Sequence, residues 1–493
     1  MSLHRRAFLA TAAAAPVVAA APSVSAMAGD LTWLDATAIA ALIRKRQISA
    51  AEAVGAAVER AKAVNPQLNF IVTPDFERAM ARAAAPNIDP APFAGQPILV
   101  KDLADWPGLP TRYGSRATQA SPPASKAEAR AAGVVAAGFT VIGKSATPEW
   151  GFLPTTEPLA FGPTKNPWDP TRSCGGSSGG AATAVASGVL PLSHATDGGG
   201  SIRIPAACCG LFGLKTSRGR STGDAKGPTD LSVSLCVSRT VRDTAALLAS
   251  VELTGAGATY APVGLVSRPS SRKLKIGFTT TDPLGHGADP EVAEAVNATA
   301  LLLESLGHDA HPLDGWGFET ATFSDDFLAL WAEGGRQVVA GVTAAAGPGA
   351  AERALEPFTL ALAKMREGLT QAQFEAAVGR VIGAGRAHLN LYKTYDVILS
   401  PVLASPAVPL GYVAPDVAFD TLRQRLQDYV GYTPLNNVAG NPAMSVPLAM
   451  SSGGLPIGIH FAADVGQERT LLELAYQLEQ AQPWIARRPA VHA

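Results

Sequence analysis

Two glycine-rich segments contain the serines that are best suited to act as nucleophiles. They read Cys174-Gly-Gly-Ser177-Ser178-Gly-Gly180 and Asp197-Gly-Gly-Gly-Ser201-Ile-Arg203. Glycine adopts backbone angles that other residues avoid and lets a ligand approach the chain closely. Consecutive glycine amides before a serine are suited to an oxyanion hole, where N–H groups stabilise an oxygen that becomes negative. The pattern therefore predicts nucleophilic catalysis by serine.

A serine hydroxyl is a poor nucleophile unless a base takes its proton, and Lys101 is the candidate base. This lysine lies in Val100-Lys101-Asp102, upstream of both glycine-rich segments. A free lysine, with a pKa of about 10.4, is protonated at neutral pH and cannot accept a proton. We therefore expect burial or hydrogen bonding to hold Lys101 neutral.

Further motifs follow these residues in a fixed order along the chain: Gly143-Lys144, Glu149-Trp150, Asn166-Pro167, Gly210-Leu-Phe-Gly-Leu-Lys215, Gly440-Asn-Pro-Ala443 and Gly454-Leu-Pro-Ile-Gly458. The ordered set resembles the amidase-signature family and covers the chain from about Asp35 to Trp484. The nucleophile motif and the ending Leu-Glu-Gln-Ala-Gln-Pro-Trp are most similar to bacterial amidases of the 6-aminohexanoate cyclic-dimer hydrolase type.

The resemblance implies a Ser-Ser-Lys triad. Ser201 resembles the nucleophile that forms an acyl-enzyme, Ser177 the bridging serine that follows a cis peptide bond, and Lys101 the base. The implied reaction needs neither a cofactor nor a metal ion, and the remaining histidines show no spacing typical of metal ligands.

The residues around the triad are expected to stabilise charge or to support the two loops. The resemblance implies an oxyanion hole made of the backbone amides of Gly198, Gly199, Gly200 and Ser201. The residues expected to support the loops rather than to react are Ser178, Asp197 and Arg203. Ser178 is also expected to begin a helix that runs through Ala186.

The implied activity is cleavage of carbon–nitrogen bonds in small or oligomeric amides. Aryl amides, carbamates and esters are alternative substrates for the same triad, and a glutaminase-type amidotransferase subunit shares the motifs. The expected partner is a small-molecule amide, and the sequence does not specify the oligomeric state, although a homodimer would be unsurprising.

Three other patterns compete with this interpretation. Gly138–Ser145 matches the phosphate-binding loop G-x-x-x-x-G-K-S, but Phe139–Ile142 resembles a strand where such a loop should be flexible. Gly175–Gly179 matches the nucleophile elbow G-x-S-x-G and would make Ser177 the nucleophile. His194 lies close enough to Ser201 in sequence to suggest a Ser–His pair, although a packed histidine is the preferred interpretation.

The acyl pocket has no clear sequence signature. Four aromatic residues are candidates for its walls, although aromatic residues more often belong to the core: Trp150, Phe152, Trp331 and Tyr432.

Residues 1–28 are predicted to be a twin-arginine signal peptide, and a basic N-terminal helix is the alternative. His4-Arg5-Arg6-Ala7-Phe8-Leu9 precedes the apolar stretch 10–21, which is too short to span a bilayer. Small residues at 24–28 offer cleavage sites. We therefore expect export to the periplasm or the medium, with residues 29–493 forming a single amidase-signature catalytic domain. Residues 254–271 resemble a linker between two lobes of that domain.

The composition excludes other classes of function. Charged residues make up 16% of the chain and the formal net charge is −1, so no clustered basic surface is available for nucleic acid. No apolar stretch is long and uninterrupted enough to predict a membrane span or stable membrane association. The four cysteines are expected to be small buried hydrophobic residues rather than a disulfide framework.

The elements that must position the triad alternate between strands and helices, which favours an α/β fold. Strands are expected at 97–101, 139–142 and 397–400, and a helix is expected at 471–480. Helix starts are expected at the capping boxes Ser49–Glu52 and Ser125–Glu128 and at Asp289 before Pro290. The family resemblance further implies a central mixed β-sheet covered by helices on both faces.

Overall fold

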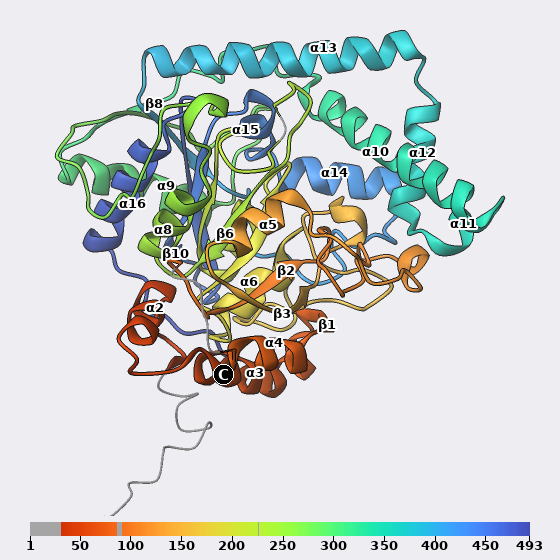
Figure 1. Ribbon diagram of the computed structural model, residues 1–493. Helices are drawn as coiled ribbons and strands as arrows, with labels where there is room; N and C mark the ends of the chain where they lie inside the picture. The colour runs from red at the N-terminus through yellow and green to blue at the C-terminus, as the bar shows by residue number, and fades with distance from the viewer. Residues whose placement is uncertain (1–30, 86–90, 225) are drawn as a thin grey trace, which may run out of the picture.

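The computed structural model describes residues 31–85, 91–224 and 226–493. The predicted signal peptide, residues 1–28, lies outside the described residues. The chain forms a large mixed sheet flanked by helices, and a smaller sheet lies beside it (Figure 1).

The large sheet has eight strands in the described residues, in the order β4-β6-β5-β10-β11-β9-β7-β8. The pairs from β4 through β9 are antiparallel, whereas β7 pairs in parallel with both β9 and β8. The expectation of a mixed sheet is therefore confirmed. The strands are β4 (Leu192–Asp197), β5 (Phe212–Lys215), β6 (Val233–Ser238), β7 (Lys275–Phe278), β8 (Asp309–Pro312), β9 (Val397–Pro401), β10 (Ala443–Met450) and β11 (Pro456–Ala463).

The smaller sheet has the order β1-β3-β2, with strands β1 (Ile71–Pro74), β2 (Pro97–Lys101) and β3 (Thr140–Ser145). Side chains of β4 bind the backbone of β2, because Ser193 donates to the carbonyl of Leu99 and His194 accepts from the amide of Lys101. The two sheets are thus joined at the residue predicted to be the catalytic base.

Helices cover both faces of the large sheet. On one face α7 covers β5, since a Cβ placed on Gly213 would lie 2.8 Å from Ala206. On the other face α8 covers the neighbouring β6, since Cys236 is hydrogen-bonded to Thr244. The helices are α2 (Ala36–Arg44), α3 (Ala50–Leu68), α4 (Phe76–Ala83), α5 (Ala129–Val135), α6 (Gly179–Ala186), α7 (Arg203–Cys209), α8 (Val241–Val251), α9 (Pro290–Ser305), α10 (Phe323–Ala346), α11 (Ala350–Ala354), α12 (Pro357–Glu367), α13 (Gln371–His388), α14 (Phe419–Tyr429), α15 (Pro434–Ala439) and α16 (Glu468–Ala481).

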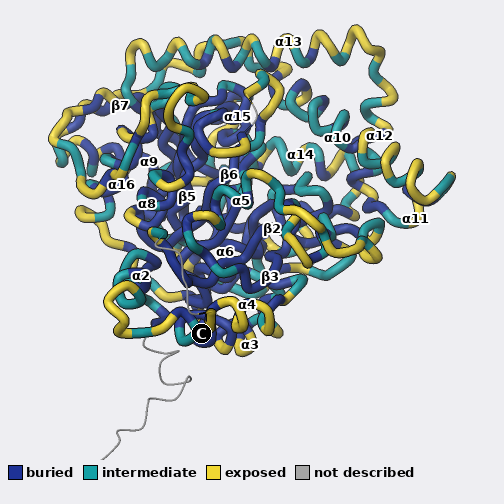
Figure 2. Tube along the Cα trace, in the orientation of Figure 1, coloured by how far each residue is buried: buried dark blue, intermediate teal, exposed yellow. Residues whose placement is uncertain are grey.

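The core lies at the centre of the molecule, where the strands and α6 are buried, while α10 to α13 form a more exposed arm (Figures 1 and 2). The segment 254–271 contains only a short 3-10 turn, and its Val263 and Val266 are buried in the main core. That it joins two lobes of one domain stays a prediction. None of the described helices is long and apolar enough to cross a bilayer.

Most expected element starts agree with the structure. Ser49 and Glu52 form the capping box of α3, and Asp289 caps α9 with Pro290 in the first turn. The expected box at Ser125–Glu128 is wrong, because α5 begins only at Ala129. The amide of Glu128 donates to the carbonyl of Asp105, which keeps this residue extended, and its side chain caps the helix instead.

Candidate active site

Lys101 is the last residue of β2, and its buried amine lies against two hydroxyl groups. Its Nζ is 2.7 Å from Ser177 Oγ and 2.9 Å from Thr196 Oγ1. The peptide bond between Gly176 and Ser177 is cis, as the family resemblance implied. The structure thus brings the predicted base and the predicted bridging serine into direct contact.

Burial changes the acid–base behaviour of this lysine. The side chain is 0% exposed, and loss of hydration lowers the pKa of Lys101 to about 7. The negative charge of Asp197 partly opposes this shift, and the positive charge of Arg130 adds to it. An amine with this pKa is neutral for a large part of the time at pH 7, so it can accept a proton.

Ser178 and Thr196 hold the two catalytic segments together. Ser178 precedes α6, and its hydroxyl donates to the carbonyl of Thr196 and accepts from the amide of the same residue. The expectation that Ser178 supports the loop and begins the helix agrees with these contacts. Thr196 was missed by the sequence analysis, although its place one residue before Asp197, on the strand that carries His194, could have suggested it.

Ser201 lies on the wall of a cavity of about 110 Å³. Its hydroxyl makes no hydrogen bond to any other described residue, so it is free to contact a ligand. Gly151 lines the same cavity, and a Cβ on that glycine would lie 3.2 Å from Ser177 Oγ. The hydroxyl of Ser177 is therefore close to the cavity that Ser201 lines, although no hydrogen bond joins the two serines in the described part of the chain.

Asp197 organises the loop that precedes Ser201. Its Oδ1 accepts from the amide of Gly200 at 2.8 Å, and its Oδ2 accepts from the amide of Ile202 at 3.2 Å. The prediction that Gly200 supplies an oxyanion donor is therefore wrong, because its N–H is already bound by a carboxylate. The amides of Gly198, Gly199 and Ser201 have no acceptor among the described residues and remain available.

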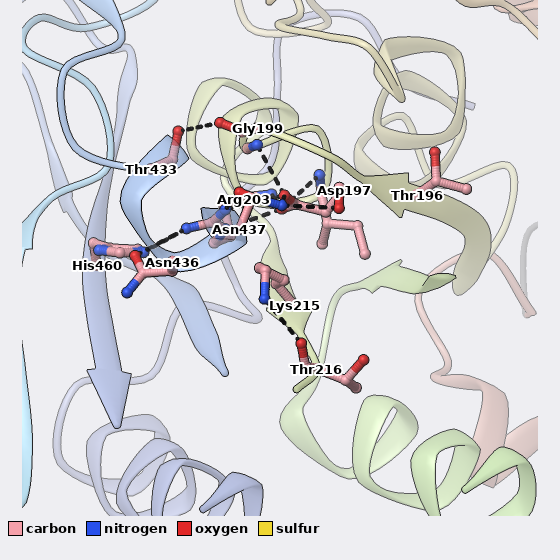
Figure 3. Close-up of polar contacts among 12 residues, drawn as sticks. Thr196, Asp197, Gly199, Arg203, Lys215, Thr216, Thr433, Asn436, Asn437 and His460 are labelled. Atoms are coloured by element: carbon pink, nitrogen blue, oxygen red, sulfur yellow. Dashed lines mark hydrogen bonds and ion pairs between the residues drawn. The ribbon is translucent and has the colours of Figure 1, made fainter. Parts of the chain in front are cut away.

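A buried ion pair anchors this carboxylate (Figure 3). Arg203 Nε lies 2.9 Å from Asp197 Oδ2, and both side chains are fully buried. Burial alone would raise the pKa of Asp197, but the guanidinium of Arg203 lowers it below its usual range. Two further side chains hold the guanidinium of Arg203. Its Nη1 lies 3.0 Å from His460 Nε2, and its Nη2 donates to Asn437 Oδ1 at 2.6 Å. Both charged residues thus act on the loop geometry, as expected.

A threonine that no sequence motif marks fixes the other side of the loop. The hydroxyl of Thr433 donates to the carbonyl of Gly199 at 2.7 Å (Figure 3). Because Thr433 lies far from the loop in sequence and no motif marks it, local sequence patterns could not have found it.

His194 is a structural residue. Its Nδ1 accepts from the amide of Lys101, and its Nε2 is 2.8 Å from the hydroxyl of Ser234. Burial, with a contribution from the charge of Lys101, lowers the pKa of His194 to about 3. The preferred interpretation of a hydrogen-bonded, packed histidine is confirmed, and a Ser–His pair is wrong.

Two of the four aromatic candidates line the cavity. Phe152 and Trp331 form part of its wall together with Phe327 and Phe358. Trp150 instead stacks on Tyr113, with ring centroids 4.2 Å apart. Tyr432 does not line the cavity either. It is buried, and its hydroxyl donates to the carbonyl of Thr280.

The two motif-based alternatives do not fit the structure. The segment that matches a phosphate loop contains β3, and its Lys144 forms a buried ion pair with Asp102 at 3.0 Å. The segment that matches a nucleophile elbow does not follow a strand directly. The cysteines in the described residues are all free and buried, as expected.

Comparison with known proteins identifies the family of this chain. The profile of the family described as Amidase matches residues 52–472. The chain belongs to the amidase-signature family. It is therefore an amide hydrolase, and the fold class and family implied by the sequence are confirmed.

The relatives of this amidase match nearly its whole length. Putative amidase AmiC of Mycobacterium tuberculosis (strain ATCC 25618 / H37Rv) is 39% identical over 455 residues, which are 92% of this chain and 95% of the relative. 6-Aminohexanoate-cyclic-dimer hydrolase of Pseudomonas sp. (strain NK87) is 34% identical over 485 residues, which cover 93% of this chain and 96% of the relative. The structure of 6-aminohexanoate cyclic dimer hydrolase complexed with substrate matches at 32% identity with a TM-score of 0.86, covering 94% of this chain and 100% of that chain.

Proposed function

We propose that this amidase cleaves small or oligomeric amides through an acyl-enzyme on Ser201, with Ser177 and Lys101 completing the triad. The observation that carries the proposal is the 2.7 Å contact between the buried Lys101 amine and the Ser177 hydroxyl. That contact lies beside a cavity onto which the unbound hydroxyl of Ser201 opens.

The proposed reaction begins with the neutral amine of Lys101. The amine takes the proton of Ser177 while Ser177 takes the proton of Ser201, and the resulting oxygen attacks the amide carbonyl. Backbone N–H groups of the loop, including those of Gly199 and Ser201, stabilise the negative oxygen. The proton then returns through Ser177 to the leaving nitrogen, the carbon–nitrogen bond breaks, and water hydrolyses the acyl-enzyme by the same route.

Two features support small or oligomeric amides as substrates. The cavity next to Ser201 has a mainly apolar wall and a volume of about 110 Å³, which suits a compact acyl group. Relatives of this chain are named 6-aminohexanoate-cyclic-dimer hydrolase, which places an oligoamide among the compounds to be tested. Aryl amides, carbamates and esters would use the same triad and belong in the same panel.

Labelling identifies the nucleophile. A fluorophosphonate should modify Ser201, as located by peptide mass spectrometry, and Ser201→Ala should lose both the label and amide hydrolysis. Ser177→Ala should retain a site for the label but lose most of the rate, because the proton relay is broken. A stable adduct on Ser177, or undiminished hydrolysis by Ser201→Ala, would contradict the proposal.

We also propose that the protein is exported in folded form by its twin-arginine signal. The pattern Arg5-Arg6 followed by an apolar stretch supports this proposal. Fractionation of cells that express the full chain should find the shortened protein outside the cytoplasm, whereas Arg5→Lys combined with Arg6→Lys should retain it inside. Equal distribution of the two proteins would argue against export by this route.

A further inference from the structure

Side chains of a neighbouring strand hold the backbone of the predicted base. In the described part of the chain, β2 is an edge strand of the smaller sheet and ends at Lys101. An edge strand has a row of N–H and C=O groups without a strand partner. Ser193 of β4 donates to the carbonyl of Leu99 at 3.2 Å, and the amide of Lys101 donates to His194 Nδ1 at 3.1 Å. These two side chains bind backbone groups that a further strand would otherwise pair with.

The imidazole ring of His194 is held on both sides. His194 and Lys101 are both fully buried, and the other ring nitrogen, Nε2, lies 2.8 Å from the hydroxyl of Ser234 on β6. Because Nδ1 accepts the Lys101 amide, the ring proton lies on Nε2, toward Ser234. Burial lowers the pKa of His194 to about 3, so the ring stays neutral and keeps its acceptor near neutral pH.

Strand β4 contacts Lys101 at both ends of that residue. His194 and Thr196 lie two positions apart on the strand, so their side chains point to the same face. His194 binds the backbone amide of Lys101, and Thr196 binds its amine at 2.9 Å. The strand ends at Asp197, which holds the loop before Ser201. The contact with β4 therefore fixes the base relative to the nucleophile.

The amine of Lys101 must lie within hydrogen-bond distance of Ser177 to take its proton, and the two are 2.7 Å apart. A shift of the Lys101 backbone would move the amine away from that hydroxyl. A misplacement of about 1 Å can cost about a hundredfold in rate. The tie between the backbone of Lys101 and β4 is therefore a determinant of the rate.

We infer that His194 is a positioning residue for the reaction, because it holds the backbone of Lys101 against β4 and thereby sets the distance between the base and the bridging serine. The inference rests on the proposed triad. Among the described residues, His194 is not part of the wall of the cavity next to Ser201, so it acts on proton transfer rather than on substrate binding.

His308 provides a matched control. Its Nδ1 accepts from the amide of Leu274 at 3.1 Å, and its Nε2 lies 2.8 Å from Gln477. It is buried like His194, but it directly precedes β8, which lies at the opposite end of the large sheet from β4. Replacing it removes the same pair of hydrogen bonds without touching the triad.

Three variants test the inference. His194→Leu and His308→Leu each remove the two ring contacts. His194→Asn restores an acceptor, because the amide oxygen of asparagine takes about the place of a histidine Nδ1. Each folded protein is compared with the wild type by its Tm and by kcat and KM on an amide that the wild type hydrolyses.

The expected effect is on kcat. His194→Leu should lower kcat by about tenfold to a hundredfold with KM little changed. His308→Leu should lose Tm to a similar extent but keep the wild-type kcat, and His194→Asn should recover most of the lost rate. If His194→Leu does not fold, Ser234→Ala and Gln477→Ala remove the outer partner of each ring, and only Ser234→Ala should lower kcat.

Four outcomes would overturn the inference: a wild-type kcat in His194→Leu, or in Ser234→Ala where that variant replaces it; an equal loss of kcat in the matched control; a loss confined to KM; and a His194→Asn variant that is no faster than His194→Leu. Activity that survives Ser201→Ala or Lys101→Met would instead refute the proposed function. The inference fails alone when those two variants are inactive and His194→Leu is not.

Discussion

Replacing Lys101 by methionine is expected to abolish hydrolysis and to raise the free energy of unfolding at neutral pH. Methionine has a similar length but no charge. Burial lowers the pKa of Lys101 from 10.5 to about 7, so folding at neutral pH must either remove a proton from this amine or bury its charge. The variant avoids this cost, while the reaction loses its base.

The size of the effect follows from the pKa shift. A change from 10.5 to about 7 destabilises the folded protein by about 4 kcal/mol at pH 7. The substitution also leaves the hydroxyls of Ser177 and Thr196 without this hydrogen-bond partner, at a cost of about 1 kcal/mol each. The expected net gain in the free energy of unfolding is therefore about 2 kcal/mol at pH 7.

The gain must shrink as the pH rises. Between pH 7 and pH 10.5 the unfolded chain holds a proton on Lys101 that the folded protein has lost. The wild type is therefore stabilised with rising pH by about 1.4 kcal/mol per unit relative to the variant. The difference in the free energy of unfolding between the two proteins should vanish at about pH 9. Lys215, whose pKa is also lowered to about 7, is present in both proteins and cancels.

Urea unfolding at pH 7, 8 and 9, followed by tryptophan fluorescence and circular dichroism, measures this difference. Lys62→Met is the control, because that lysine is exposed and paired only with Glu59 on the surface of α3. A stability difference for Lys101→Met that does not change with pH would refute the reasoning. The wild-type kcat/KM should also rise with pH, with a midpoint near the Lys101 pKa of about 7.

The loop and the cavity give three further predictions. Asp197→Asn should lower the free energy of unfolding by about 3–5 kcal/mol, because it leaves a buried guanidinium unpaired, and thermal unfolding would show it as a marked loss in Tm. Gly200→Ala should inactivate the enzyme, since the new Cβ would lie 2.4 Å from Thr433 Oγ1 and the backbone φ of +138° disfavours any side chain. Gly198→Ala should be tolerated, because the nearest atom to its new Cβ would be 3.6 Å away. Equal rates for these two variants would contradict this account of the loop. Trp331→Leu should enlarge the apolar cavity and raise kcat/KM for bulkier acyl groups relative to compact ones, and an unchanged ratio in a series of acyl lengths would argue against its place in the wall.

The sequence alone indicated the family, which is confirmed, and the candidate reactive groups, because both depend on local requirements. A cluster of glycines is needed wherever the backbone must leave the common angles and approach a reacting carbonyl, and such clusters are visible around Ser177 and Ser201. The start of α9 was equally local, because an N-cap Asp289 and the following Pro290 act within one turn.

Tertiary structure decided the features that depend on distant partners. Whether Gly200 offers its amide to a substrate depends on Asp197, which the fold turns back toward the loop. The start of α5 depends on a backbone hydrogen bond between Glu128 and Asp105, which no capping motif records.

The wall of the Ser201 cavity and the side chain that fixes the loop before Ser201 come from residues distant in sequence from the serines. Trp331 comes from α10, and Thr433 reaches the loop from the segment before α15. The same aromatic residue type is a cavity wall at Trp331 and a stacking partner of Tyr113 at Trp150. Side-chain chemistry was therefore readable from the sequence, whereas the direction in which each side chain points was set by packing between elements far apart in the chain.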